Sequence, residues 1–301
     1  MIAATFAAFR LPGYAALWIS AAAAAFARSI MLIAIGWTAL LVSDSVLAVG
    51  VTFAARFVPS LVLGIPIGAI VDRFDRRGTL VALNLIAVAP LLAAAAVAGG
   101  GLLGLPALIA LSVILGTIDT VQGTAAHSYA FDLAGVDGAT NAIALGTLGE
   151  QLLVSVGSIV GGLALERFGV VTTFELAAAA SAIAAVTLVL LGRRAGHPEH
   201  ARRQVPDFRR SLTLVARNRV VGLIALIVIL GEVLGFSSMT LYPVFARDVL
   251  HTDAAGLGAL SAARSIGAVA GLLLLAGLGF GGRGGVLLLI ATLAFGLSLV
   301  A

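Results

Sequence analysis

Long uninterrupted apolar segments constrain the fold of this 301-residue chain more than any other feature of its sequence. A helix rises about 1.5 Å per residue, so about 20 apolar residues cross roughly 30 Å of hydrocarbon. The apolar runs lack the two-residue alternation of half-buried strands, which favours membrane-spanning helices. The runs cover residues 14–42, 46–71, 79–98, 105–131, 142–165, 170–191, 220–245, 254–280 and 286–301. The sequence therefore predicts an all-α, polytopic membrane protein with about nine transmembrane helices.

Composition excludes several other classes of protein. The chain is 61% hydrophobic and 11% charged, whereas soluble domains are about 45–50% apolar and about 25% charged. It has no cysteine, which excludes disulfides, thiolate catalysis and cysteine-bound metals. The sequence also contains no Walker loop and no Gly-x-Ser-x-Gly elbow, so we expect neither an enzyme nor an ATP-driven pump.

The basic residues predict the topology of the chain. All 18 are arginine, and most fall in short connections between the apolar runs, as membrane topology requires. With the N-terminus in the cytoplasm, thirteen of the fifteen arginines outside the spans lie on the cytoplasmic side. We therefore interpret the basic balance as topological and expect a lipid bilayer, not nucleic acid, as the surrounding partner.

One polar connection predicts the domain organisation. Residues 192–219 carry eight arginines and two prolines between the sixth and seventh runs. We predict an N-terminal six-helix bundle over 1–191, a cytoplasmic linker over 192–219 and an incomplete C-terminal bundle of three helices over 220–301. His197 and His200 lie three apart in this linker without a third ligand, so no metal site is expected.

The loop between the second and third runs holds the most specific motif. It reads Gly68-Ala-Ile-Val-Asp72-Arg73-Phe-Asp75-Arg76-Arg77 and resembles the signature loop of the major facilitator superfamily. Asp75 stands where many members have glycine. The resemblance implies twelve helices in two bundles, with the C-terminal part truncated here, and gives Gly68, Asp72, Arg73, Arg76 and Arg77 a gating role at the cytoplasmic face.

A second stretch, Arg56-Phe-Val-Pro59, extends the resemblance to the branch with siderophore (enterobactin) and macrolide exporters. The resemblance implies a secondary active transporter that exports an amphipathic small molecule by proton-coupled antiport. It would act as a monomer in the bacterial inner membrane, with the proton gradient in place of a cofactor. Uptake and a truncated, non-transporting remnant stay open as alternatives; an intramembrane enzyme has no supporting nucleophile or metal motif.

Glycines in the fifth run have two interpretations. Gly157, Gly161 and Gly162 resemble the end of the glycine-proline motif of antiporters in this superfamily, but Ser158 replaces the proline. The GxxxG spacing also favours close helix packing, which we expect for these residues. The same spacing recurs at Gly64/Gly68, Gly231/Gly235 and Gly267/Gly271.

Ionisable residues within the spans are candidate functional sites, because each costs a few kcal/mol in the bilayer. Arg28, Asp119 and Glu232 fall at mid-depth of spans that would line the central cavity of the resembling fold. Arg28 and Asp119 have opposite charges and form either a structural pair or a substrate or proton site.

Asp119 also begins Asp119-Thr-Val-Gln-Gly, which resembles the family's Arg-x-x-Gln-Gly motif with its arginine replaced. Glu232 has no evident partner in the sequence, so we predict that it carries the coupling proton. Glu150 and Glu175 are weaker candidates for this role. Arg56 and Arg264 are expected to snorkel or to pair structurally.

Overall fold

The computed structural model describes residues 6–71, 73–191, 218, 222–223, 226, 238–278 and 284–300. These residues form helices joined by short connections, with no strand among them, which confirms the predicted all-α class. The long helices are α2 (Tyr14–Ser43), α3 (Val46–Val71), α4 (Arg76–Gly99), α5 (Leu105–Leu191), α8 (Ala254–Leu278) and α9 (Gly284–Val300). Two short helices, η1 (Ala7–Arg10) and η2 (Phe245–Val249), complete this part of the chain.

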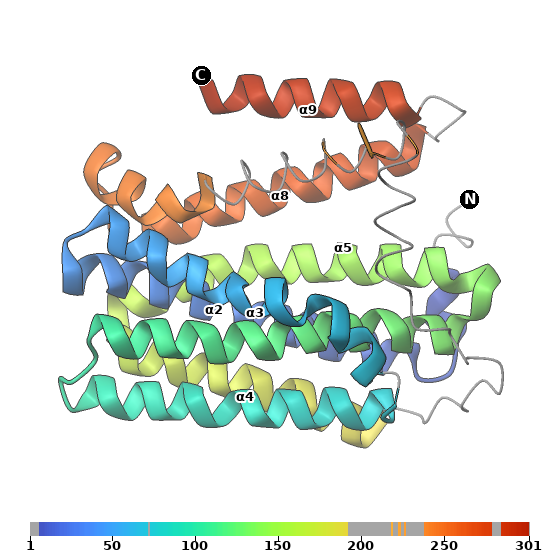
Figure 1. The fold of residues 1–301 in the computed structure, drawn as a ribbon, viewed down its shortest axis with the longest axis horizontal. Helices are drawn as coiled ribbons and strands as arrows, with labels where there is room; N and C mark the ends of the chain where they lie inside the picture. The colour runs from blue at the N-terminus through green and yellow to red at the C-terminus, as the bar shows by residue number, and fades with distance from the viewer. Residues whose placement is uncertain are drawn as a thin grey trace.

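The helix α5 contains three of the predicted spans. Its 87 residues are interrupted at Gly135 and Gly169, whose φ angles of 66° and 79° only glycine adopts readily. At these two points the chain reverses, so α5 runs back and forth along the molecule (Figure 1). The first reversal, at Gly135, falls within the polar residues 132–141, where we had expected a connection between two spans.

Within the described residues, five helices, α5 among them, are long and apolar enough to cross a membrane. The predicted number of nine spans is not established, because most of the seventh run lies outside the described residues. The other helix limits lie close to the predicted ones. Helix α4 begins at Arg76, three residues early, because the Asp75 carboxylate accepts a 2.7 Å hydrogen bond from the Gly78 amide and caps the helix.

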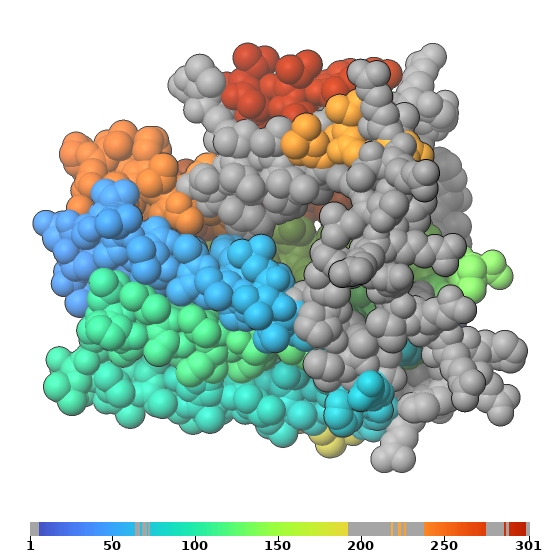
Figure 2. All heavy atoms as spheres, viewed as in Figure 1, coloured from blue at the N-terminus to red at the C-terminus, as the bar shows by residue number. Residues whose placement is uncertain are grey.

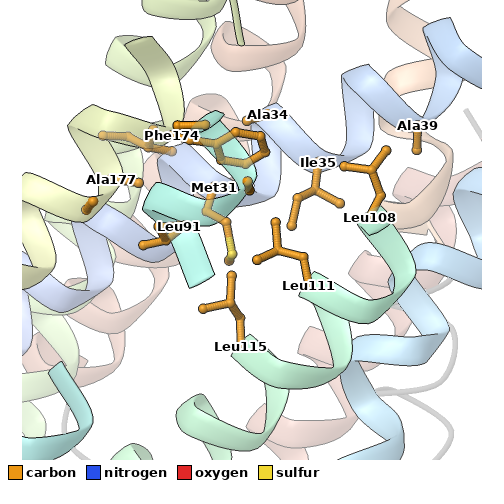
Figure 3. Close-up of a cluster of buried hydrophobic side chains, with 14 of the residues drawn as sticks. Met31, Ala34, Ile35, Ala39, Leu91, Leu108, Leu111, Leu115, Phe174 and Ala177 are labelled. Atoms are coloured by element: carbon orange, nitrogen blue, oxygen red, sulfur yellow. The ribbon is translucent and has the colours of Figure 1, made fainter. Parts of the chain in front are cut away.

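The helices α2 to α5 pack side by side into one bundle, with α2 between segments of α5 (Figure 1). We call the end with the connection at Asp44 the Asp44 end, and the opposite end, with Arg76, the signature-loop end. One buried apolar cluster lies toward the Asp44 end and includes Met31, Leu111 and Phe174 (Figure 3). A second cluster, around Tyr14 and Tyr129, lies toward the signature-loop end.

Helix α8 packs against α5 outside this bundle. Two glycines allow the crossing: a Cβ on Gly162 would lie 2.5 Å from the carbonyl oxygen of Ala254, and one on Gly258 would lie 2.4 Å from that of Ser158. Figure 2 shows the orange segment that leads into α8 over the blue connection between α2 and α3. We call this crossing between α5 and α8 the seam.

Candidate functional site

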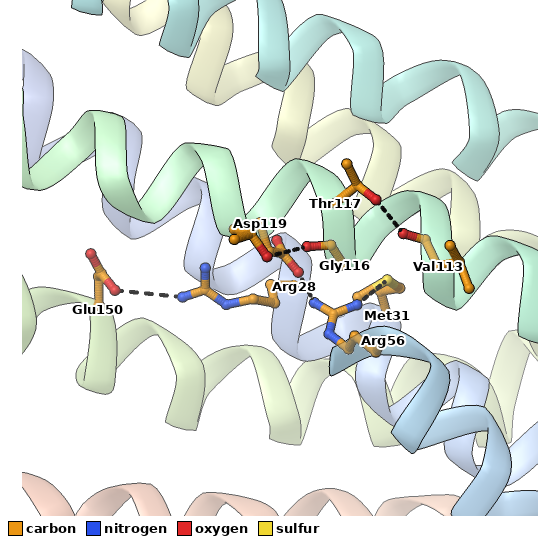
Figure 4. A network of polar contacts seen from close by, with 9 residues as sticks. Arg28, Met31, Arg56, Val113, Gly116, Thr117, Asp119 and Glu150 are labelled. Atoms are coloured by element: carbon orange, nitrogen blue, oxygen red, sulfur yellow. Dashed lines mark hydrogen bonds and ion pairs between the residues drawn. The ribbon is translucent and has the colours of Figure 1, made fainter. Parts of the chain in front are cut away.

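A buried ion pair between α3 and α5 lies between the two apolar clusters. Arg56 donates to the carboxylate of Asp119, and the Arg56 and Asp119 side chains are 7% and 25% exposed (Figure 4). Arg56 also lies 3.4 Å from the sulfur of Met31. The helices can approach here because residue 116 is glycine; a Cβ would lie 2.0 Å from the Arg56 carbonyl oxygen. Arg56 therefore forms a structural pair. This is one of the two roles expected from the sequence, the other being to snorkel toward the membrane surface.

Arg28 pairs with a different acid from the one we had considered. Its Nη2 lies 3.5 Å from the Glu150 carboxylate, and both side chains are about one-third exposed, at 29% and 33% (Figure 4). A structural pair of Arg28 with Asp119 was one of two alternatives from the sequence, and the structure instead pairs Asp119 with Arg56. The contact between Arg28 and Glu150 is long and partly open, which is the geometry of a pair that can separate.

Both members of this looser pair line a cavity of about 180 Å³. Asn84 and Gln122 lie on its wall and are joined by a 2.7 Å hydrogen bond between their amide groups. We call this space the polar cavity. Its lining is Leu17, Ser20, Ala21, Ala24, Arg28, Leu80, Asn84, Gln122, Gly123, Ala126, His127 and Glu150.

His127 is a residue that the sequence analysis missed. It lies in α5 and lines the polar cavity with Glu150. A histidine inside a predicted span was a usable signal, because imidazole changes charge near neutral pH. Together, Arg28, His127 and Glu150 place a guanidinium, an imidazole and a carboxyl group on the wall of one cavity.

Part of the predicted signature loop is described, and its arginines bind within the α2–α5 bundle. Arg76 donates to the carboxylate of Asp132, and both are largely buried. Arg77 donates to the carbonyl oxygens of Leu188 and Val189 at 2.9 Å each. The predicted gating role of this loop stays a prediction, since Asp72 lies outside the described residues.

The predicted coupling residue Glu232 also lies outside the described residues. The predicted packing role of the span-five glycines fits the structure. A Cβ on Gly157 would lie 2.8 Å from the Phe26 carbonyl oxygen, and one on Gly161 would lie 2.9 Å from the Cα of Ile30. At Gly267 and Gly271 no described atom lies within 4 Å of an added Cβ, and the packing role of this pair stays a prediction.

A second, smaller cavity of about 50 Å³ lies where the α2–α5 bundle meets α8. We call it the seam cavity. Its wall is mainly apolar but includes hydroxyl groups and one arginine. The lining residues are Ser29, Leu32, Ile33, Phe53, Val154, Ser158, Met239, Tyr242, Pro243, Leu257, Ser261, Arg264 and Ser265.

A surface ion cluster joins the bundle to η2 at the Asp44 end. Arg247 contacts Asp44 at 2.7 Å, and its Nε donates to Asp248 at 2.6 Å. The hydrogen bond from Arg247 lowers the pKa of Asp248, and hydrogen bonds to both acids raise the pKa of Arg247. This cluster connects two parts of the chain that are 203 residues apart.

Comparison with known families agrees with this architecture. The model of the family described as transmembrane secretion effector, within the major facilitator superfamily, matches residues 3–301. The chain belongs to this family. No curated protein sequence matched this chain. Membership confirms the major facilitator resemblance and a multi-pass membrane protein from a family of transporters, not of enzymes.

Proposed function

We propose that this protein is a proton-coupled exporter of amphipathic small molecules in the bacterial inner membrane. The observation that supports the proposal is the polar cavity, where a loosely paired acid and arginine lie at mid-length of apolar helices. Such ionisable groups in a membrane mark substrate or proton pathways. In this proposal a six-helix bundle over 1–191 and a second bundle after the linker 192–219 move against each other around a midplane site.

Glu150 is the described acid that best fits proton coupling. When Glu150 is ionised, it attracts Arg28 across 3.5 Å. Protonation removes that attraction and frees Arg28, so one proton changes two polar groups that face the same cavity. Glu232 stays a second candidate for this role, on the sequence argument alone.

We expect inside-out vesicles with an acidic lumen to accumulate a charged amphipathic probe. Dansylcholine and dansyltaurine share one aromatic group and carry permanent charges of opposite sign, so a pH gradient alone does not redistribute them. Accumulation of either probe, abolished by a protonophore, supports the proposal. If both probes stay at the level of vesicles without the protein, the proposed function is contradicted for this class of molecule.

Replacing Glu150 tests the coupling step. Glu150→Gln mimics the protonated acid and cannot release its proton, so we expect accumulation that no longer responds to the pH gradient. Glu175→Gln is the matched control, because Glu175 is an exposed acid elsewhere in α5 and does not line the polar cavity. If Glu150→Gln keeps gradient-driven accumulation and Glu232→Gln loses it, the coupling proton belongs to Glu232.

The orientation can be tested in this cysteine-free chain. We expect a single cysteine at Leu250 to react with an impermeant maleimide on intact cells and one at Glu199 to react only after permeabilisation. The arginine distribution is the reason, since positively charged connections stay in the cytoplasm. Leu250 is exposed beside η2, and its replacement leaves the described ion cluster intact. Labelling of position 199 on intact cells would reverse the orientation.

A further inference from the structure

Arg264 differs from the other two arginines predicted to lie within spans. Arg56 and Arg28 each face a carboxylate, Asp119 and Glu150 respectively. Arg264 lies in the middle of α8, and no described residue forms an ion pair or hydrogen bond with it. A cation is costly within a membrane helix and marks a candidate site. The described structure therefore contains a cation that lacks its counter-charge.

The surroundings of Arg264 suit one end of an amphipathic molecule. Arg264 lines the seam cavity, together with large apolar side chains such as Leu32, Phe53 and Leu257. A volume of about 50 Å³ holds a few water molecules and is therefore the size of a charged headgroup. Among the described lining residues none is acidic, so the wall itself does not neutralise the cation.

The hydroxyl groups of the wall fall into two sets. Ser29 and Ser158 bond to each other at 2.7 Å and to the carbonyl oxygen of Val154, so they are satisfied within the wall. The hydroxyls of Tyr242 and Ser261 have no partner among the described residues. With Arg264, they give the seam cavity three kinds of available donor for an anion.

We propose that the seam cavity binds the anionic headgroup, a carboxylate or sulfonate, of the exported molecule, with Arg264 as its counter-ion. The hydroxyls of Tyr242 and Ser261 donate further hydrogen bonds, and the apolar wall contacts the adjoining part of the ligand. This inference rests on the proposed function, because it names the substrate class at the seam between the parts that move. It is independent of the proton step at Glu150.

Binding to the purified full chain tests the inference separately from transport. We expect dansyltaurine to bind more tightly than dansylcholine, as measured by dansyl fluorescence in detergent. Arg264→Gln should weaken dansyltaurine binding by about 10- to 100-fold, the range for a lost hydrogen bond to a charged group. Arg264→Lys should restore part of the affinity, and Arg264→Glu should reverse the preference toward dansylcholine.

A matched control separates a local charge from the overall charge of the protein. Arg167→Gln removes an exposed arginine of α5 that does not line the seam cavity, and it should leave dansyltaurine binding unchanged. Equal binding by the parent and Arg264→Gln, or tighter binding of dansylcholine by the parent, would overturn the inference. In either case, gradient-driven accumulation of dansylcholine would leave the proposed export function standing.

Discussion

Asp119→Asn should lower the free energy of unfolding of the purified protein by about 3–5 kcal/mol, the cost of removing one partner from a buried ion pair. The substitution leaves Arg56, which is only 7% exposed, without its counter-charge between two apolar clusters. Thermal unfolding in detergent, followed by tryptophan fluorescence, measures the loss. A variant as stable as the parent would show that the pair contributes little to the fold.

A double variant separates the structural role of this pair from a role in coupling. Arg56→Met with Asp119→Leu removes both charges and fills similar volume, so most of the lost stability should return. If the stable double variant also keeps gradient-driven transport, Asp119 is structural, as its close contact with Arg56 indicates. If the double variant is stable but inactive, the proton site belongs to Asp119 and our assignment to Glu150 is wrong.

Gly258→Val should open the crossing between α5 and α8. The added Cβ would lie 2.4 Å from the carbonyl oxygen of Ser158, and backbone on both sides of the contact leaves no flexible side chain to move away. Overpacking of this kind costs about 1–3 kcal/mol or more. We expect the helices to separate at the Asp44 end and the buried seam to become accessible.

A cysteine at Ser155 reports on this separation. Ser155 is 6% exposed and donates a 3.3 Å hydrogen bond to the carbonyl oxygen of Ala262 across the seam. Its maleimide labelling should be low in the parent and rise with Gly258→Val to the level of a cysteine at exposed Leu250. Gly267→Val on the same helix is the control, since no described atom lies within 4 Å of its added Cβ. Equal labelling in both variants would contradict a tight crossing at Gly258.

The sequence predicted the limits of the helices well, but it predicted less well which side chains pair between helices. Apolar run length located α2 and α3 nearly to the residue, because the bilayer sets that length physically. Pairing across helices depends on their rotation and separation, which a single run does not encode. Asp119 contacts Arg56 because Gly116, one turn away in α5, allows the α3 backbone to lie close to α5. Among 36 glycines, nothing in the sequence distinguished that one.

Local polarity located one connection but not how short it is. Residues 132–141 are polar, as expected for a connection, and the chain turns within them at Gly135 while the residues on either side stay helical. Asp132 belongs there because it binds Arg76, a contact between positions 56 residues apart. Counting acids and arginines within spans also passed over His127, since a single imidazole barely changes mean hydropathy.

Arg77, at the signature-loop end, is one of the arginines that predict the topology, and it also forms hydrogen bonds within the bundle. Arg77 donates to the carbonyl oxygens of Leu188 and Val189 in the last turn of α5, where an α-helix carries partial negative charge and unpaired acceptors. An arginine that is predicted to keep this face in the cytoplasm thus also pairs with carbonyl groups at the end of α5. Moving Arg77 to the other end of the bundle, as a reversal of the proposed orientation would require, would therefore also remove two hydrogen bonds from the end of α5.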